Sequence, residues 1–176
     1  SYSLQDAIAN RRILQPHVDL LWLPPRKLAT MDYHRISSEL ENDDNRNRII
    51  TEIAHEFVSN GYSTAVIVNY ISHGRILHRL IPNSVFLSGE DDEDRRSQVY
   101  QQFEAKEFPC LISTLLNEAI NLPNLNVVIV TMLDKSVTRM LQRLRMMTWV
   151  EGKDLAYCLL IGDDIRYFRT AAKACR

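Results

Sequence analysis

Short runs of apolar and β-branched residues recur along the chain and alternate with segments of helical periodicity. The plainest run, Thr64 to Val68 (TAVIV), is typical of a strand that is buried on both faces of a parallel sheet. Before it, apolar residues recur every three or four positions from Ile49 to Val58, and this segment closes at Asn60-Gly61, a pair typical of helix ends. The pattern predicts an amphipathic helix followed by a buried strand.

The same alternation continues along the rest of the chain. It predicts further strands at residues 18–23, 84–87, 110–113, 126–130 and 156–161, and further helices at 1–14, 73–80, 93–105, 136–147 and from 164 onward. Strands that alternate with helices of about 8 to 15 residues imply right-handed βαβ crossovers and a mainly parallel sheet with helices on both faces. The predicted fold class is therefore α/β, a three-layer sandwich.

A polar segment separates the first predicted strand from the others. Pro24-Pro25 ends that strand, and residues 26–45 are mixed polar residues with an acidic cluster, which predicts an exposed connector. We therefore divide the chain into a linker helix, strand and connector at 1–45 and one lobe at 46–176. A length of 176 residues with 45% hydrophobic composition is enough for one domain with a core of its own.

Composition narrows the possible partners. The formal net charge of -1 gives no overall basic field, so any contact with nucleic acid must be local. Cys110, Cys158 and Cys175 are widely spaced and form no metal or redox motif, which favours a reducing, intracellular setting without a metal site. No apolar stretch reaches the roughly 18 residues needed to cross a bilayer, so we expect a soluble protein without a membrane partner.

The loops that follow the strands are where ligands bind in sheets of this kind, and here they lack nucleotide-binding motifs. No GxxxxGK[ST] sequence occurs and the five glycines are scattered singly, so the chain has no phosphate-cradling loop. Nor does a DExD or DExH quartet follow a strand; the acidic run from Asp91 to Asp94 precedes a helix, where the helix dipole explains it. A small-molecule enzyme would also need a nucleophile–base pair at the strand ends, and we find none.

The loop after the strand at 110–113 is the most informative. It contains two hydroxyls, Ser113 and Thr114, then Glu118, Asn121 and the turn residue Pro123. Glu118 and Asn121 could simply satisfy backbone groups in a tight turn before the proline. The sequence around them favours a second interpretation.

The order of the segments resembles the C-terminal RecA-like lobe of superfamily 2 DNA helicases, of the phage, DNA-repair and type III restriction kind. Residues 113–123 are similar to helicase motif V, 65–80 to motif IV, 87–89 to the Ser-Gly segment of the family, and 142–149 to motif VI. The resemblance covers almost the whole chain. It implies a RecA-like fold, that is, a P-loop NTPase-like lobe without a P-loop.

The resemblance also implies roles for individual residues. The expected nucleic-acid contacts are Asn69, His73, Ser88, Gly89, Ser113 and Thr114. Glu118, Asn121 and Gln142 would face the nucleotide cleft, and Arg145, with Arg143 second, would stabilise the charge that develops during phosphoryl transfer. A packing role for His73 and a solvated helix face for the arginines are the alternatives.

Three positions depart from the family pattern: Ala119 replaces a glycine, Asn121 an aspartate and Thr148 the second arginine of motif VI. Two functions therefore stay open. The chain could be the second motor lobe of a helicase or translocase that binds single-stranded DNA, with ATP and Mg²⁺ bound only when an N-terminal lobe supplies the P-loop. Alternatively, it could be a degenerate lobe that serves as a nucleic-acid- or protein-binding scaffold. In neither case do we expect ATP hydrolysis by this chain alone.

Overall fold

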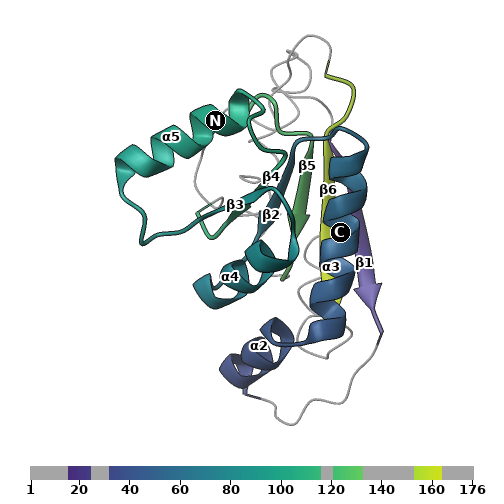
Figure 1. Ribbon diagram of the computed structural model, residues 1–176. Helices are drawn as coiled ribbons and strands as arrows, with labels where there is room; N and C mark the ends of the chain where they lie inside the picture. The colour runs from purple at the N-terminus through teal and green to yellow at the C-terminus, as the bar shows by residue number, and fades with distance from the viewer. Residues whose placement is uncertain (1–15, 25–31, 116–120, 133–152, 164–176) are drawn as a thin grey trace, which may run out of the picture.

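The computed structural model describes residues 16–24, 32–115, 121–132 and 153–163 (Figure 1). In chain order the elements are β1 (His17–Leu23), α2 (Tyr33–Glu41), α3 (Asp44–Ser59), β2 (Thr64–Ile67), α4 (Ile71–Leu80), β3 (Ser84–Leu87), α5 (Glu93–Glu104), β4 (Cys110–Ser113), β5 (Val127–Val130) and β6 (Tyr157–Asp163). The strands predicted from the sequence all form, with bounds that differ by no more than two residues at either end.

All six strands belong to one sheet in the order β1-β6-β5-β2-β4-β3, and every neighbouring pair is parallel. Every residue of β2, β4 and β5 is buried, because these strands are continuous apolar runs that are covered on both faces. The predicted fold class, an α/β sandwich with a parallel sheet, is confirmed.

Two apolar cores lie on opposite faces of this sheet. Helices α3 and α4 cover one face through residues such as Ile50 and Leu77, and α5 covers the other through Val99 and Phe103. Successive residues of a strand alternate between the two cores, as the pleat requires. The described part of the chain contains no helix with the length and apolar character needed to cross a membrane.

The prediction of an exposed connector at residues 26–45 is wrong for the part that the structure describes. The Asp32 side chain caps helix α2 by accepting a hydrogen bond from the backbone N–H of Arg35 (3.0 Å), and Ile36 and Leu40 on this helix are buried in the core. The apolar pattern did not predict helix α2, because only two apolar residues four positions apart, Ile36 and Leu40, lie on its buried face. Strand β1 likewise pairs with β6 in the main sheet instead of standing apart in a linker.

Three predicted helices, at 1–14, 136–147 and from 164 onward, lie outside the described residues. The helix predicted at residues 49–58 is part of α3, whose N-cap is Asp43 and whose C-cap is Asn60, as the Asn-Gly pair indicated. Gly61 follows with a φ of 83°, a backbone conformation that favours glycine.

The packing of α4 against the edge of the sheet depends on a glycine. A Cβ atom added at Gly74 would lie closer than 3.0 Å to three atoms of the Phe86 ring, so the helix can approach β3 only where no side chain intervenes. Gly89, by contrast, has no atom nearer than the Leu115 Cδ2 atom at 3.9 Å.

We predict that Gly74→Ala lowers the free energy of unfolding by about 1–3 kcal/mol, because the ring or the helix must shift to admit the methyl group. Urea denaturation followed by circular dichroism measures the change. Gly89→Ala is the matched control and is expected to stay within about 0.5 kcal/mol of the unsubstituted chain. Equal stability of the two variants would show that the space between Gly74 and the Phe86 ring can admit a methyl group without cost.

Candidate functional site

The ends of three neighbouring strands lie side by side at the carboxyl edge of the sheet. The Val68 N–H donates to the Ser113 carbonyl (3.1 Å), and the Thr114 N–H donates to the Leu87 carbonyl (3.3 Å). The loops that follow β2, β4 and β3 therefore leave the sheet in adjacent positions. These are the loops in which the sequence placed its nucleic-acid contacts.

The six predicted contact residues differ in exposure. Gly89 is exposed, and Asn69 and Thr114 are half-buried, so these three can meet a ligand at the surface. Ser113 and Ser88 are buried, with exposed fractions of 0% and 4%. Their hydroxyls hold the loops in shape: the Ser113 hydroxyl accepts from the Leu115 N–H (2.9 Å), and Ser88 takes part in the turn described next.

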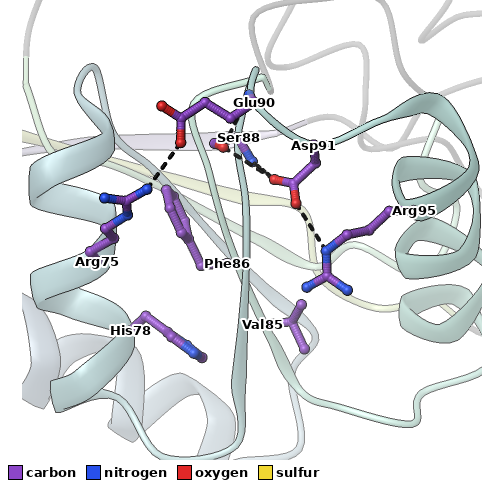
Figure 2. Close-up of a pocket in the computed structure, with 8 residues that line it drawn as sticks. All are labelled: Arg75, His78, Val85, Phe86, Ser88, Glu90, Asp91 and Arg95. Carbon is purple, nitrogen blue, oxygen red and sulfur yellow. Dashed lines mark hydrogen bonds and ion pairs between the residues drawn. The ribbon is translucent and has the colours of Figure 1, made fainter.

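A carboxylate closes the loop after β3. Asp91 accepts hydrogen bonds from the Ser88 N–H (2.7 Å) and hydroxyl (3.1 Å), and it pairs with the Nε atom of Arg95 at 2.9 Å (Figure 2). Desolvation opposes ionisation of Asp91, but the contacts with Ser88 and Arg95 outweigh it and lower the pKa of the carboxyl. Asp92 then caps α5, as expected for an acidic first turn. The turn holds the exposed Gly89 at the edge of the sheet.

The other half of the carboxyl edge is filled by a buried ion pair. Arg46, at the start of α3, has an exposed fraction of 0% and Asp163, at the end of β6, one of 2%. The Arg46 Nε atom lies 3.1 Å from Asp163 Oδ1, and Nη2 lies 3.1 Å from Oδ2 and also donates to the Thr131 carbonyl. The Thr131 hydroxyl donates to the Ile67 carbonyl (2.9 Å). One guanidinium thus joins α3 to the ends of β5 and β6.

Sequence reasoning did not predict this pair, although the sequence carries a signal for it. Arg46 lies four residues before Ile50 and eight before Ala54, and all three are buried on the inner face of α3. An arginine at the i−4 position of an apolar stripe either reaches solvent or finds a buried acid. Nothing in the local pattern shows that the acid is Asp163, which is 117 residues away.

His73 lies in a second buried network, which connects α2, α3 and α4. Its exposed fraction is 1%, and its Nε2 atom is 3.0 Å from the Asn47 amide oxygen. The Asn47 Nδ2 group donates to the Glu41 carbonyl (2.7 Å), and the Ser72 hydroxyl donates to the Glu41 carboxylate (2.7 Å). Burial, with a smaller contribution from the charge of Arg46, lowers the pKa of His73 to about 3.

The position of His73 corrects its assignment as a surface contact. A side chain that is 1% exposed can meet a nucleic-acid strand only if α4 moves, and its hydrogen bond to Asn47 gives it a packing role. Of the nucleotide-cleft residues, Asn121 is exposed beside the buried Leu122. Glu118, Gln142, Arg143 and Arg145 lie outside the described residues, so their roles stay predictions. Within the described ranges no group of three or more histidine, cysteine, aspartate or glutamate side chains could hold a metal ion.

A parallel sheet with helices on both faces and adjacent polar loops at its carboxyl edge is typical of doubly wound α/β lobes, which bind ligands at this edge. The family model described as the helicase conserved C-terminal domain matches residues 31–145, and the chain belongs to this family, as the C-terminal RecA-like lobe of a superfamily 2 helicase. No curated protein matches the chain.

Several solved structures share this fold. The chain is similar to T4 UvsW (TM-score 0.69, 18% identity, 84% of this chain and 32% of that one) and to the C-terminal part of the Fun30 ATPase domain (0.62, 11%, 74% and 45%). It is also similar to S. cerevisiae Dbp5 bound to RNA and ADP BeF3 (0.60, 14%, 73% and 35%). The chain thus spans between 32% and 45% of the length of the chains in these three structures.

We predict that Arg46→Leu lowers the free energy of unfolding by about 3–5 kcal/mol, because it leaves the Asp163 carboxylate buried without its cation. The double variant Arg46→Leu/Asp163→Leu should recover part of this loss, since no charge then stays buried alone. Chemical denaturation of both single variants and the double variant completes the thermodynamic cycle. Arg48→Leu removes an exposed pair with Glu52 and should change stability by less than about 1 kcal/mol. Additive effects at positions 46 and 163 would contradict the coupling.

We further predict that His73 makes stability fall as the pH is lowered from about 7.5 to 5.5. The unfolded chain binds a proton near the ordinary pKa of 6.5, whereas the folded chain does not until about pH 3. The contribution of His73 to the free energy of unfolding is complete above its pKa in the unfolded chain and is lost as the pH falls toward its pKa in the folded chain. Between pH 7.5 and 5.5 this loss amounts to about 1 kcal/mol. Urea midpoints of the chain and of His73→Gln at the two pH values test this, and the variant should lose correspondingly less stability. An equal loss in both proteins would assign the pH dependence to other groups.

Proposed function

We propose that this chain is the second motor lobe of an ATP-dependent helicase or translocase. In this role it contacts the phosphates of a nucleic-acid strand and contributes an arginine to an ATP site shared with an N-terminal lobe. The observation that supports this best is the adjacency of the loops after β2, β4 and β3, in a chain that belongs to the helicase C-terminal family. Asn69, Thr114 and Gly89 offer polar and backbone groups at the surface of these loops.

Phosphate is the part of a nucleic acid that such groups fit. Backbone N–H groups and small hydroxyl or amide side chains commonly contact phosphate oxygens, and these contacts carry no sequence information. Gly89 has no side chain and lies at the surface, which allows a phosphate to approach its backbone closely. Because the formal net charge is -1, binding by the lobe alone is expected to be weak and to weaken further with salt.

The nucleotide part of the proposal depends on a partner lobe. The sequence contains no P-loop, so ATP and Mg²⁺ would be held by an N-terminal RecA-like lobe across a shared cleft. Arg145, with Arg143 as the second candidate, would approach the phosphates from this lobe as the two lobes close. Single-stranded DNA is the expected track. Among the similar structures, Dbp5 is bound to RNA and ADP BeF3, a nucleic acid together with a nucleotide complex.

A second function is favoured by the altered motifs. Ala119, Asn121 and Thr148 stand where the family has a glycine, an aspartate and an arginine, and all three changes fall in the segments expected to face the nucleotide. A lobe with these substitutions could still bind nucleic acid or another protein without supporting turnover. This scaffold would keep the surface loops and lose the coupling to ATP.

We predict that this chain, joined to the N-terminal sequence that accompanies it in nature, hydrolyses ATP faster when single-stranded DNA is added. Arg145→Ala should lower the DNA-stimulated kcat by about 100-fold or more, because the charge that develops on the phosphoryl group loses its cation. Phosphate release in steady state measures both rates. Gly89→Glu should instead raise the DNA concentration needed for half-maximal stimulation and leave the unstimulated rate unchanged.

Arg48→Ala, on an exposed part of α3, is the control for that experiment and should behave as the unsubstituted protein does. Turnover that is unaffected by Arg145→Ala would remove this residue from the proposed mechanism. Absence of any turnover in the joined protein, with DNA binding retained, would favour the scaffold.

A further inference from the structure

A pocket of about 480 Å³ lies along the outer edge of β3 and reaches the loop that carries Gly89 (Figure 2). Its lining comes from α4, β3, the loop after β3 and α5, through residues Arg75, His78, Val85, Phe86, Ser88, Glu90, Asp91 and Arg95. Helices α4 and α5 cover opposite faces of the sheet, so a pocket lined by both must straddle the edge of the strand.

Strand β3 is the last in the sheet, and β4 is its one neighbour among the described strands. An edge strand of this kind has backbone donors and acceptors directed away from the sheet, which can pair with an added strand. The sequence SVFL is short but contains no charged residue and no proline, two of the devices that discourage such pairing. Val85 and Phe86 are half-buried, so apolar surface remains beside the backbone for a cross-strand contact.

Two arginines flank this edge, one on each face of the sheet. Phe86 packs on the side of α4, where Arg75 lies, and Val85 packs on the side of α5, where Arg95 lies (Figure 2). Arg75 pairs with Glu90 at 3.0 Å and Arg95 with Asp91 at 2.9 Å, and the two arginine side chains are 64% and 52% exposed.

Each guanidinium still has capacity for a further carboxylate. In the described part of the chain, Arg75 bonds through Nη2 and Arg95 through Nε, which leaves other N–H groups of the fork for a second partner. Exposed ion pairs of this kind contribute little to stability, so exchange with an incoming acid costs little.

We propose that the open edge of β3 binds an extended acidic peptide segment of a protein partner as an added strand. Successive side chains of a strand point to opposite faces, and Arg75 and Arg95 lie on opposite faces. Two carboxylates of the peptide can therefore reach both arginines only at odd spacing, for example at neighbouring positions. Two carboxylates separated by a single residue point to the same face and reach one arginine at most. This recognition does not depend on the proposed motor function.

A nucleic-acid strand fits this edge less well. It carries one phosphate per nucleotide, and the five consecutive carboxylates beside the pocket, Glu90 to Asp94, disfavour such a chain more strongly than a peptide with only two acids. A peptide can place its two acids opposite the arginines and neutral residues elsewhere. Its backbone also matches the repeat of donors and acceptors along β3, which a phosphate backbone does not.

Two fluorescein-labelled peptides of ten residues and identical composition test the proposal. Both consist of threonine and valine with two glutamates, which are adjacent in the first peptide and separated by one residue in the second. Fluorescence anisotropy with the full 176-residue chain should show binding of the first peptide that is tighter by about threefold or more. A third peptide, the first with alternate backbone amides methylated, should bind at least tenfold more weakly, because it cannot pair with the strand.

Variants of the chain identify the site. Arg75→Gln and Arg95→Gln should each weaken the binding of the first peptide by about threefold, a change typical of the loss of one exposed ion pair. Each variant should then bind the first and second peptides with equal affinity. Arg48→Gln removes an arginine from a comparable exposed pair on α3 and should leave binding unchanged. Arg75→Glu should reverse the preference toward a peptide in which one glutamate is replaced by lysine. Thermal unfolding of each variant establishes that it is folded.

Several outcomes would overturn the proposal. These are equal affinity for the two spacings, no binding of either peptide at millimolar concentration, and an effect of Arg48→Gln as large as that of Arg75→Gln. A loss of oligothymidylate binding in Arg75→Gln and Arg95→Gln, without a change in peptide binding, would assign the pocket to nucleic acid instead.

Discussion

An arginine with no exposed surface, Arg46, holds together parts of the chain that are far apart in sequence. Burying a guanidinium without a partner would cost several kcal/mol, and this cost falls only because Asp163 and the Thr131 carbonyl lie within hydrogen-bonding distance. Among the described residues the Arg46 Nη1 atom has no hydrogen-bond partner, so the charge is not fully satisfied. The fold therefore tolerates little movement of α3 relative to β5 and β6, since separation would leave the Arg46 guanidinium buried without its partners.

This constraint divides the carboxyl edge of the sheet into two halves. At the ends of β5 and β6, Arg46 and Asp163 form a buried ion pair. At the ends of β2, β4 and β3, the loops are closed by short-range contacts, such as that of Ser113 with the Leu115 N–H, and leave Gly89 at the surface. The second half thus presents the surface groups on which the proposed function rests, while the first half is a buried charge pair.

The sequence predicts the sheet well because the central strands are buried on both faces and must be apolar at every position, as in Thr64 to Val68. It predicts α2 poorly, because two apolar residues on a short polar helix do not stand out from a loop. It also cannot show which polar residues are interior. His73 and Ser113 have the residue types of a binding site, yet both are buried, and His73 meets Asn47 only because α4 packs against α3. The order of the strands, with β4 between β2 and β3, is likewise a property of the packed sheet and has no local signature.

The contact of Arg46 with Thr131 also bears on the nucleotide site that we propose. Thr131 and Met132 are the last described residues before the segment that carries Gln142, Arg143 and Arg145 in sequence, and both are buried. The Thr131 backbone is held from two directions, by the Arg46 guanidinium at its carbonyl and by the Ile67 carbonyl at its N–H (3.1 Å) and its hydroxyl. A residue that must reach the phosphates of a bound nucleotide needs such a fixed point of departure, because an error of about 1 Å at the reacting group costs about 100-fold in rate. The same buried charge that restrains the core therefore restrains Thr131, which precedes in sequence the segment of the proposed arginines.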